Sequence, residues 1–252
     1  MATISEISKD LCSGEQVKAY KARRELAKAT RAAGASDAGD KRSELAKELA
    51  TALAALTPAK DSRGEPTLES IRFVEGAADL CRALSTVGGD MEVPAVKKCL
   101  ANIDLREPAR WCLARLNCQA ATDALVEALK NTSGTEFRVG LVNALGRKAG
   151  SSVVDALKAV AAEDHEPEMR LAAAEALAEQ PVAALDGAIS AVDPGASSRG
   201  KTRVARARIR LGETLVRSGD KVGAKTVFTA VAAADVGEPQ KKAAQAALAT
   251  LG

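Results

Sequence analysis

One recurring eight-residue segment constrains the fold of this chain more than any other feature. Its clearest copies are RVGLVNAL at 138–145, RLAAAEAL at 170–177 and RIRLGETL at 208–215. Each copy begins with arginine, continues with an aliphatic residue and ends in leucine. With three weaker copies, the closing leucines are Leu84, Leu116, Leu145, Leu177, Leu215 and Leu248, which are separated by 32, 29, 32, 38 and 33 residues. An interval of this size accommodates two helices and predicts a helical repeat protein.

A second apolar segment precedes the copies. Within 151–162, Val154, Leu157, Val160 and Ala161 recur at three- and four-residue intervals, as expected for one buried face of a helix. Proline loses no hydrogen bond in the first turn of a helix, so it marks helix starts. The prolines at the expected starts are Pro94, Pro108, Pro167, Pro181 and Pro239. Each repeat is therefore predicted to consist of a helix, a short turn and a second helix.

The composition favours helices over strands. Hydrophobic residues make up 46% of the 252 residues but aromatic residues only 2%, so alanine, leucine and valine supply most of the apolar material. The 36 lysines and arginines nearly balance the 33 acidic residues, which gives a net charge of +3. Any basic surface must therefore be local.

A spacing of six residues connects the turns with the second helices. Asp164 precedes Arg170 by six residues, and Asp104 precedes Arg110 by the same interval. A turn aspartate and a helix arginine can meet those of the next repeat and satisfy exposed groups at helix ends. The predicted structural ladder consists of Asp104, Arg110, Arg138, Asp164, Arg170, Arg208, Asp235 and Lys241.

Together these motifs resemble the HEAT-repeat family, especially the short HEAT-like repeats of phycobilin lyases. The resemblance implies an all-α fold, a right-handed α–α superhelix (solenoid) of about six helical pairs whose second helices line a concave surface. Residues 67–252 would form the array, interrupted by an inserted loop at 192–202. Residues 1–56 would form a further helical pair or a cap, and 57–66 is predicted to be a linker.

The single histidine, His165, is followed by Glu166 and raises the question of a metal site. Deoxyhypusine hydroxylases, which are built from HEAT-like repeats, hold iron with several His–Glu pairs. Here the aligned turn positions are Ser133 and Val236, which cannot act in the same way. His165 is therefore predicted to be an exposed turn residue, and we predict no metal, no cofactor and no catalytic residue. The five cysteines form no C-x-x-C pair, which favours reduced thiols in the cytoplasm.

The segment SSRGKTRVARARIR at 197–210 is basic and contains no acidic residue. Arg203, Arg206 and Arg210 are spaced by three and four residues, so they would share one face of a helix. Such a stripe could bind an acidic protein tail or phosphates. The candidate partner-binding residues are Arg199, Lys201, Arg203, Arg206 and Arg210. The alternative is a solvated face that binds nothing.

The main functional hypothesis is a non-enzymatic scaffold or adaptor in the cytoplasm that binds another protein or an acidic segment. The resemblance alone suggests one alternative, a lyase or chaperone for a chromophore like the phycobilin lyases. The basic segment suggests the other, nucleic-acid binding through residues 199–210. Trp111 is expected to lie in the core rather than in a binding groove. No apolar stretch approaches the roughly 20 residues of a membrane span, so a soluble protein is expected.

Overall fold

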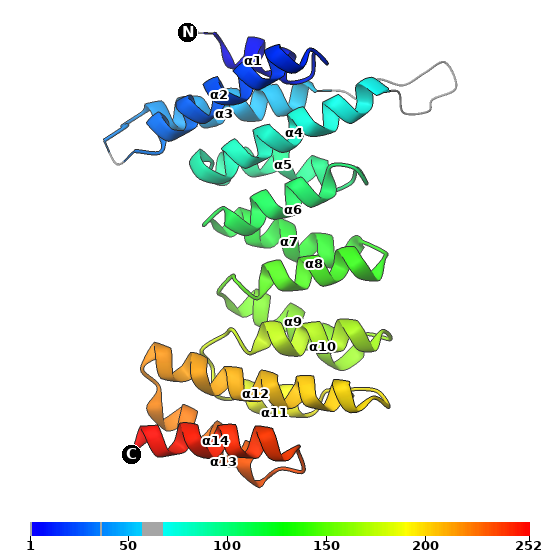
Figure 1. The fold of residues 1–252 in the computed structure, drawn as a ribbon, viewed down its shortest axis with the longest axis vertical. Helices are drawn as coiled ribbons and strands as arrows, with labels where there is room; N and C mark the ends of the chain where they lie inside the picture. The colour runs from blue at the N-terminus through cyan, green and yellow to red at the C-terminus, as the bar shows by residue number, and fades with distance from the viewer. Residues whose placement is uncertain (1, 36, 57–67) are drawn as a thin grey trace. The chain divides into compact units, whose positions relative to one another are not determined.

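The computed structural model describes residues 2–35, 37–56 and 68–252 (Figure 1). Within these ranges the chain forms fourteen α-helices and one short 3-10 helix, and it forms no strand. The all-α helical-repeat fold predicted from the sequence is therefore confirmed. The contacts divide the chain into two compact units, Met1–Leu125 and Val126–Gly252. The predicted linker 57–66 lies outside the described residues.

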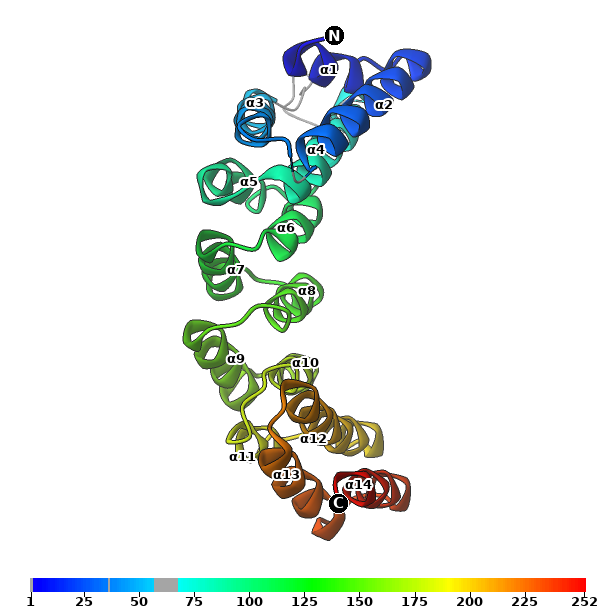
Figure 2. The same cartoon turned by 90° about the vertical axis from the view of Figure 1, so that its left-hand side faces the viewer.

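The first unit is built from two layers of helices. Its elements are α1 (Ile4–Leu11), α2 (Gln16–Ala33), α3 (Lys41–Ala55), α4 (Leu68–Val87), η1 (Asp90–Glu92), α5 (Val93–Cys99), α6 (Arg106–Arg115) and the start of α7 (Gln119–Asn131). Helix α4 packs against α2 and α6, and α3 packs against α5. Figure 2 shows α2, α4 and α6 in one layer and α3 and α5 in the other.

The N-terminal helices belong to the same compact unit as the first repeats. Helix α3 pairs with α4, and Arg42 near its start donates hydrogen bonds to the carbonyls of Thr86 and Val87 at the end of α4. These bonds satisfy carbonyls that have no partner inside the helix. Helix α1 was not predicted from the sequence; a capping box between Thr3 and Glu6 fixes its start.

The second unit repeats the two-layer arrangement. After the end of α7 its helices are α8 (Thr135–Leu145), α9 (Ser151–Glu163), α10 (Pro167–Leu177), α11 (Leu185–Ser190), α12 (Ser198–Ser218), α13 (Lys221–Ala233) and α14 (Glu238–Leu251). Helices α8, α10, α12 and α14 form one layer, in which neighbours pack together, and α9, α11 and α13 form the other (Figure 2). The recurring eight-residue segment falls on the second helix of each pair, as predicted.

The inserted loop is shorter than the sequence predicted. The irregular segment between α11 and α12 covers only residues 191–197, and residues 198–202 form the first turn and more of α12. Ser197 caps the helix, because its hydroxyl accepts a hydrogen bond of 3.0 Å from the N–H of Gly200. The prediction of a loop at 192–202 is therefore wrong for residues 198–202, which are helical. The longer interval in the sequence lengthens α12 instead.

Small side chains allow close helix packing in the second unit. On α10, alanines 172, 173, 174 and 176 are all buried between neighbouring helices. Between α12 and α13, Gly212 leaves room for the ring of Phe228, which is only 1% exposed. A Cβ atom on Gly212 would lie 2.5 Å from Cε1 of that ring, closer than any real contact. Small side chains, rather than aromatic ones, thus fill most of the space between these helices.

Candidate functional site

One ion pair of the predicted ladder crosses from one repeat to the next. Arg138 on α8 binds the carboxylate of Asp164, which lies in the turn between α9 and α10. The second carboxylate oxygen accepts a hydrogen bond of 3.0 Å from the N–H of Glu166. Burial acts to raise the pKa of Asp164, but the Glu166 and Arg138 interactions outweigh it, so the pKa lies below its usual range. The aspartate is therefore held charged at the start of α10.

This arrangement predicts a specific pH dependence of stability. Because the folded pKa of Asp164 is lower than that of an unfolded aspartate, about 3.9, the pair stabilises the protein above that pH. The contribution is lost as the pH falls through the folded pKa. Wild type should lose more free energy of unfolding than Asp164→Asn between about pH 7 and about pH 3, as measured by urea titration at each pH. Equal losses would show that Asp164 does not carry this dependence.

Two other ladder arginines are bound, but their carboxylate partners differ from those expected. Arg170 donates to the carbonyl of Asp164 at 2.8 Å in its own turn, and its carboxylate partner is Asp193 in the loop before α12. Arg208 binds Asp186 of α11 through two hydrogen bonds of 2.7 and 2.8 Å. Arg170 thus connects α10, and Arg208 connects α12, to the segment 185–197, where the interval between repeats is longest.

The remaining ladder positions do not pair as expected. Arg110 binds Glu107 one turn earlier on its own helix, at 2.7 Å, and Asp104 is exposed. Asp235 is exposed, and no ion pair joins it to Lys241 in the part of the chain that the structure describes. Spacing along the sequence indicated which residues lie near each other, but it did not determine which ion pairs their side chains form.

The predicted basic stripe on α12 is not a row of free cations. Arg203 binds Glu175 and Glu168 of α10 at 2.7 Å each, and these hydrogen bonds raise the pKa of Arg203 above its usual range. Arg210 binds Glu179 at 3.1 Å. The expectation that Arg203 faces a partner must therefore be corrected, because α10 supplies the carboxylates that neutralise it, whereas Arg210 stays exposed beside Glu179 just after α10. Arg199, Lys201 and Arg206 are exposed and form no ion pair among the described residues.

His165 lies exposed in the turn before α10, and its carbonyl accepts a hydrogen bond from Arg170. Its role in the structure is thus that of a turn residue. The described residues contain no group of three or more histidine, cysteine or acidic side chains that could hold a metal ion.

Three thiols lie buried between α4, α5 and α6. They belong to Cys81, Cys99 and Cys112. A hydrogen bond to Cys99, together with burial, raises the pKa of the Cys81 thiol far above its usual range. The same hydrogen bond lowers the pKa of the Cys99 thiol. A protonated, buried thiol is a poor nucleophile, so Cys81 acts as a core residue.

Helix α6 presents an exposed tryptophan, contrary to the prediction that Trp111 lies in the core. The indole is 41% exposed, and the guanidinium of Arg115 lies over its ring, 4.9 Å from the centroid. The buried face of the helix is formed by Ala109, Cys112 and Leu113 instead. Trp111 and Arg115 are four residues apart, so they share the outer face of α6. The register of these small and apolar residues was the sequence signal for this exposure.

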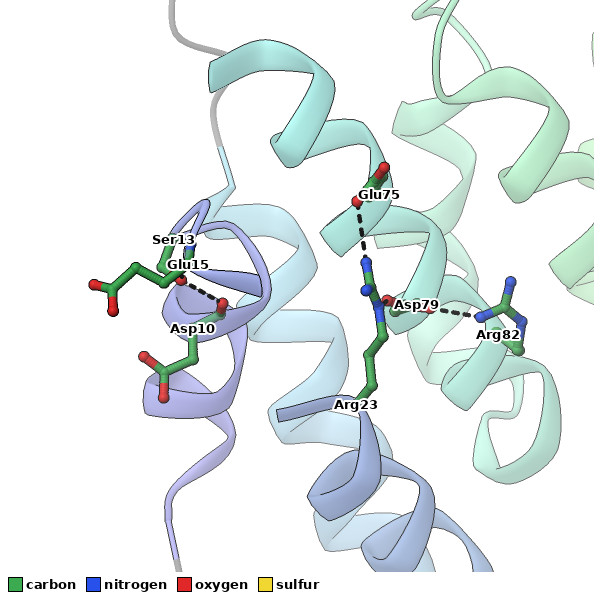
Figure 3. Close-up of polar contacts among 7 residues, drawn as sticks. All are labelled: Asp10, Ser13, Glu15, Arg23, Glu75, Asp79 and Arg82. Atoms are coloured by element: carbon green, nitrogen blue, oxygen red, sulfur yellow. Dashed lines mark hydrogen bonds and ion pairs between the residues drawn. The ribbon is translucent and has the colours of Figure 1, made fainter. Parts of the chain in front are cut away.

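A groove between α2 and α4 is the second prominent surface of the first unit. Arg23 on α2 reaches across to α4 and binds Asp79 at 2.7 Å and Glu75 at 3.0 Å, while Arg82 binds Asp79 from the other side (Figure 3). Beside this network lies a cavity of about 430 Å³, the α2–α4 groove. Its apolar lining includes Leu26. The sequence interpretation had not singled out any of these residues.

Figure 3 also shows how the chain turns into α2. The hydroxyl of Ser13 donates to the carbonyl of Asp10 at 2.9 Å, and the N–H of Glu15 donates to the same hydroxyl at 3.3 Å. These bonds fix the turn between α1 and α2 and so set the direction of α2 beside the groove.

No helix among the described residues is long and apolar enough to pass through a lipid bilayer.

Comparisons with known proteins match part of the chain to one family model. The family model for HEAT repeats matches residues 93–178. Among solved structures, a chain in the complex of CpcE and CpcF of phycocyanin lyase from Nostoc sp. PCC7120 is 17% identical, with 100% of this chain and 96% of that chain covered and a TM-score of 0.45. A chain from a computational design of self-assembling cyclic homooligomers is 16% identical over 98% of this chain and 93% of that one, with a TM-score of 0.21. A search of curated proteins found no match. The chain is therefore an all-α helical-repeat protein, and its residues 93–178 match the family model for HEAT repeats.

Proposed function

We propose that this protein is a non-enzymatic scaffold that binds another protein through the exposed face of its second helices, with Trp111 of α6 at the centre of the contact. The observation that carries the proposal is the exposed indole stacked with Arg115. Tryptophan and arginine are the residue types most enriched where binding energy concentrates in protein interfaces. Helix α6 also lies inside the segment matched by HEAT repeats.

The chemistry of this face suits a protein partner. The indole offers a large apolar surface at low cost in side-chain entropy, and Arg115 holds it by a cation–π contact. Glu107 and Arg110 form an ion pair beside it on the same helix and supply polar groups for a rim. An apolar centre with a polar rim is the usual anatomy of a protein interface.

Site-specific photo-crosslinking in the source cells tests this proposal. A crosslinking amino acid in place of Glu107, which is exposed on α6, should yield a discrete adduct with one protein. The same amino acid in place of Lys98, exposed on α5 in the other layer, is the matched control and should yield none. With the partner identified from the adduct, Trp111→Ala should weaken binding by about 2 kcal/mol, or about 30-fold in dissociation constant.

Two results would contradict the proposal. Equal adduct yields at the Glu107 and Lys98 positions would show that α6 is not the binding face. An unchanged dissociation constant for Trp111→Ala, measured by calorimetry with the purified partner, would remove Trp111 from the interface. Because Trp111 is exposed, its replacement should leave the circular dichroism spectrum unchanged.

A further inference from the structure

Helix α2 carries an excess of positive charge that the rest of the structure does not neutralise. Its basic residues are Lys18, Lys21, Arg23, Arg24, Lys28 and Arg31, against a single acidic residue, Glu25. Lys18 binds Glu15 and Arg23 binds Glu75 and Asp79. The other four cations are exposed and form no ion pair within the residues that the structure describes.

The contrast with α12 shows why this excess matters. Both helices are rich in arginine, but Glu168 and Glu175 of α10 bind Arg203 of α12, and Glu179 just after α10 binds Arg210. Lys21, Arg24, Lys28 and Arg31 form no ion pair with a neighbouring helix among the described residues, although Glu44 and Glu48 of α3 line a cavity together with Lys28. Like charges on one helix repel one another and attract anions. The uncompensated basic surface of the first unit is therefore on α2.

These cations border an aromatic ring and an apolar groove. Tyr20, Arg24, Ala27 and Arg31 are spaced by four, three and four residues, so they form one stripe along α2. Tyr20 is 61% exposed, and the guanidinium of Arg24 lies 6.0 Å from its ring centroid. Ala27 and Arg31 line the α2–α4 groove, together with the buried Ala83 of α4. The stripe thus combines positive charge with apolar surface.

We propose that the α2 basic face, formed by Tyr20, Lys21, Arg24, Lys28 and Arg31, binds an acidic segment of another protein whose apolar side chain enters the α2–α4 groove. Carboxylates of the segment complement the four cations, and the apolar side chain covers Ala27 and Ala83. The proposal goes beyond the Trp111 site, because it concerns different residues and names the chemistry of the bound segment.

The groove favours a protein segment over the other polyanions. Tyr20 is the one aromatic residue of the stripe, whereas nucleic-acid binding without sequence preference uses several stacked rings. A lipid surface would not reach Ala83, which is buried in the groove. A peptide side chain can reach it.

Fluorescence anisotropy with the full chain tests the proposal. The probe is a fluorescein-labelled peptide of repeated Glu-Glu-Leu-Ala units, and the neutral control peptide has Gln in place of Glu. The acidic peptide should bind at least about tenfold more tightly than the neutral one. Ala27→Glu should weaken binding of the acidic peptide at least about tenfold, whereas Ala27→Lys should not weaken it.

The two Ala27 variants form a matched pair, because Ala27 is exposed and both new residues are good helix formers. Arg24→Glu/Arg31→Glu should have the same effect as Ala27→Glu, and Arg199→Glu/Arg206→Glu on α12 should have none. All of these variants leave Trp111 unchanged, so a failure here is distinguishable from a failure of the α6 site. Circular dichroism confirms that each variant is folded.

Three outcomes would overturn the proposal. One is equal binding of the acidic and neutral peptides, including no binding of either. Another is equal affinity of wild type, Ala27→Glu and Ala27→Lys. The third is tighter binding of a short DNA duplex or of phosphatidylserine vesicles than of the acidic peptide, which would assign the α2 basic face to nucleic acid or to membrane.

Discussion

Replacing Arg138 with alanine is expected to lower the free energy of unfolding by about 3 kcal/mol. The carboxylate of Asp164 is mostly buried, with a side chain only 9% exposed, and Arg138 is its only ion-pair partner among the described residues. The variant would leave this charge buried with one backbone hydrogen bond from Glu166. Loss of one partner from a buried pair costs far more than loss of an exposed pair.

Arg210→Ala is the matched control, since the Arg210–Glu179 pair also joins a second helix to a neighbouring repeat but both side chains are well exposed. It should cost about 0.5 kcal/mol. Urea titration at neutral pH measures both variants. Arg138→Ala/Asp164→Ala should recover part of the loss, because no unpaired carboxylate remains. Similar losses for Arg138→Ala and Arg210→Ala would refute the structural importance of the first pair.

Gly212→Val should destabilise the protein by about 3 kcal/mol, because a Cβ at this position would overlap the buried ring of Phe228. Valine has a higher helix propensity than glycine, but this gain is worth less than about 1 kcal/mol. The clash therefore outweighs the propensity. Thermal and urea unfolding measure the net change.

Gly187 on α11 provides the control, because a Cβ there would meet nothing within 4 Å. Gly187→Val should change the free energy of unfolding by less than about 0.5 kcal/mol. Phe228→Leu should restore part of the stability of Gly212→Val, since the two residues share one contact and their effects are not additive. If Gly212→Val were as stable as wild type, the packing between α12 and α13 would not be as tight as described.

The repeat architecture could be predicted because it rests on features that recur. The leucines and alanines of 170–177 are buried as the period of the pattern required, and Pro167 begins α10 as a proline at a helix start should. Pro181, by contrast, lies four residues before α11 begins at Leu185. A single proline limits where a helix can start but does not fix it.

The partners of individual side chains could not be predicted from spacing. Arg208 and Asp235 line the same cavity of about 610 Å³, so the expected neighbourhood is real. Arg208 nevertheless binds Asp186, which lies on the preceding helix of its own pair. A long arginine side chain can reach several carboxylates at similar cost in free energy. The short helix α11 places Asp186 where Arg208 can donate two hydrogen bonds to its carboxylate.

The candidate surfaces were missed for different reasons. Trp111 was assigned to the core because large aromatic residues are usually buried, although the register of Ala109, Cys112 and Leu113 already placed it on the opposite face. The charge of α2 was visible in the sequence but is spread over a whole helix. The compact run at 199–210 was more conspicuous, and its neutralisation by α10 depends on tertiary packing.

Because Trp111 is exposed, its intrinsic fluorescence can also report on its surroundings. It is the only tryptophan among the 252 residues, so indole emission comes from one known point on α6. A half-exposed indole next to a guanidinium emits at long wavelength, and contact with an apolar surface would shift the emission to shorter wavelength. Changes at α6 can therefore be followed in the unlabelled protein, while changes confined to α12 would leave the spectrum as it is.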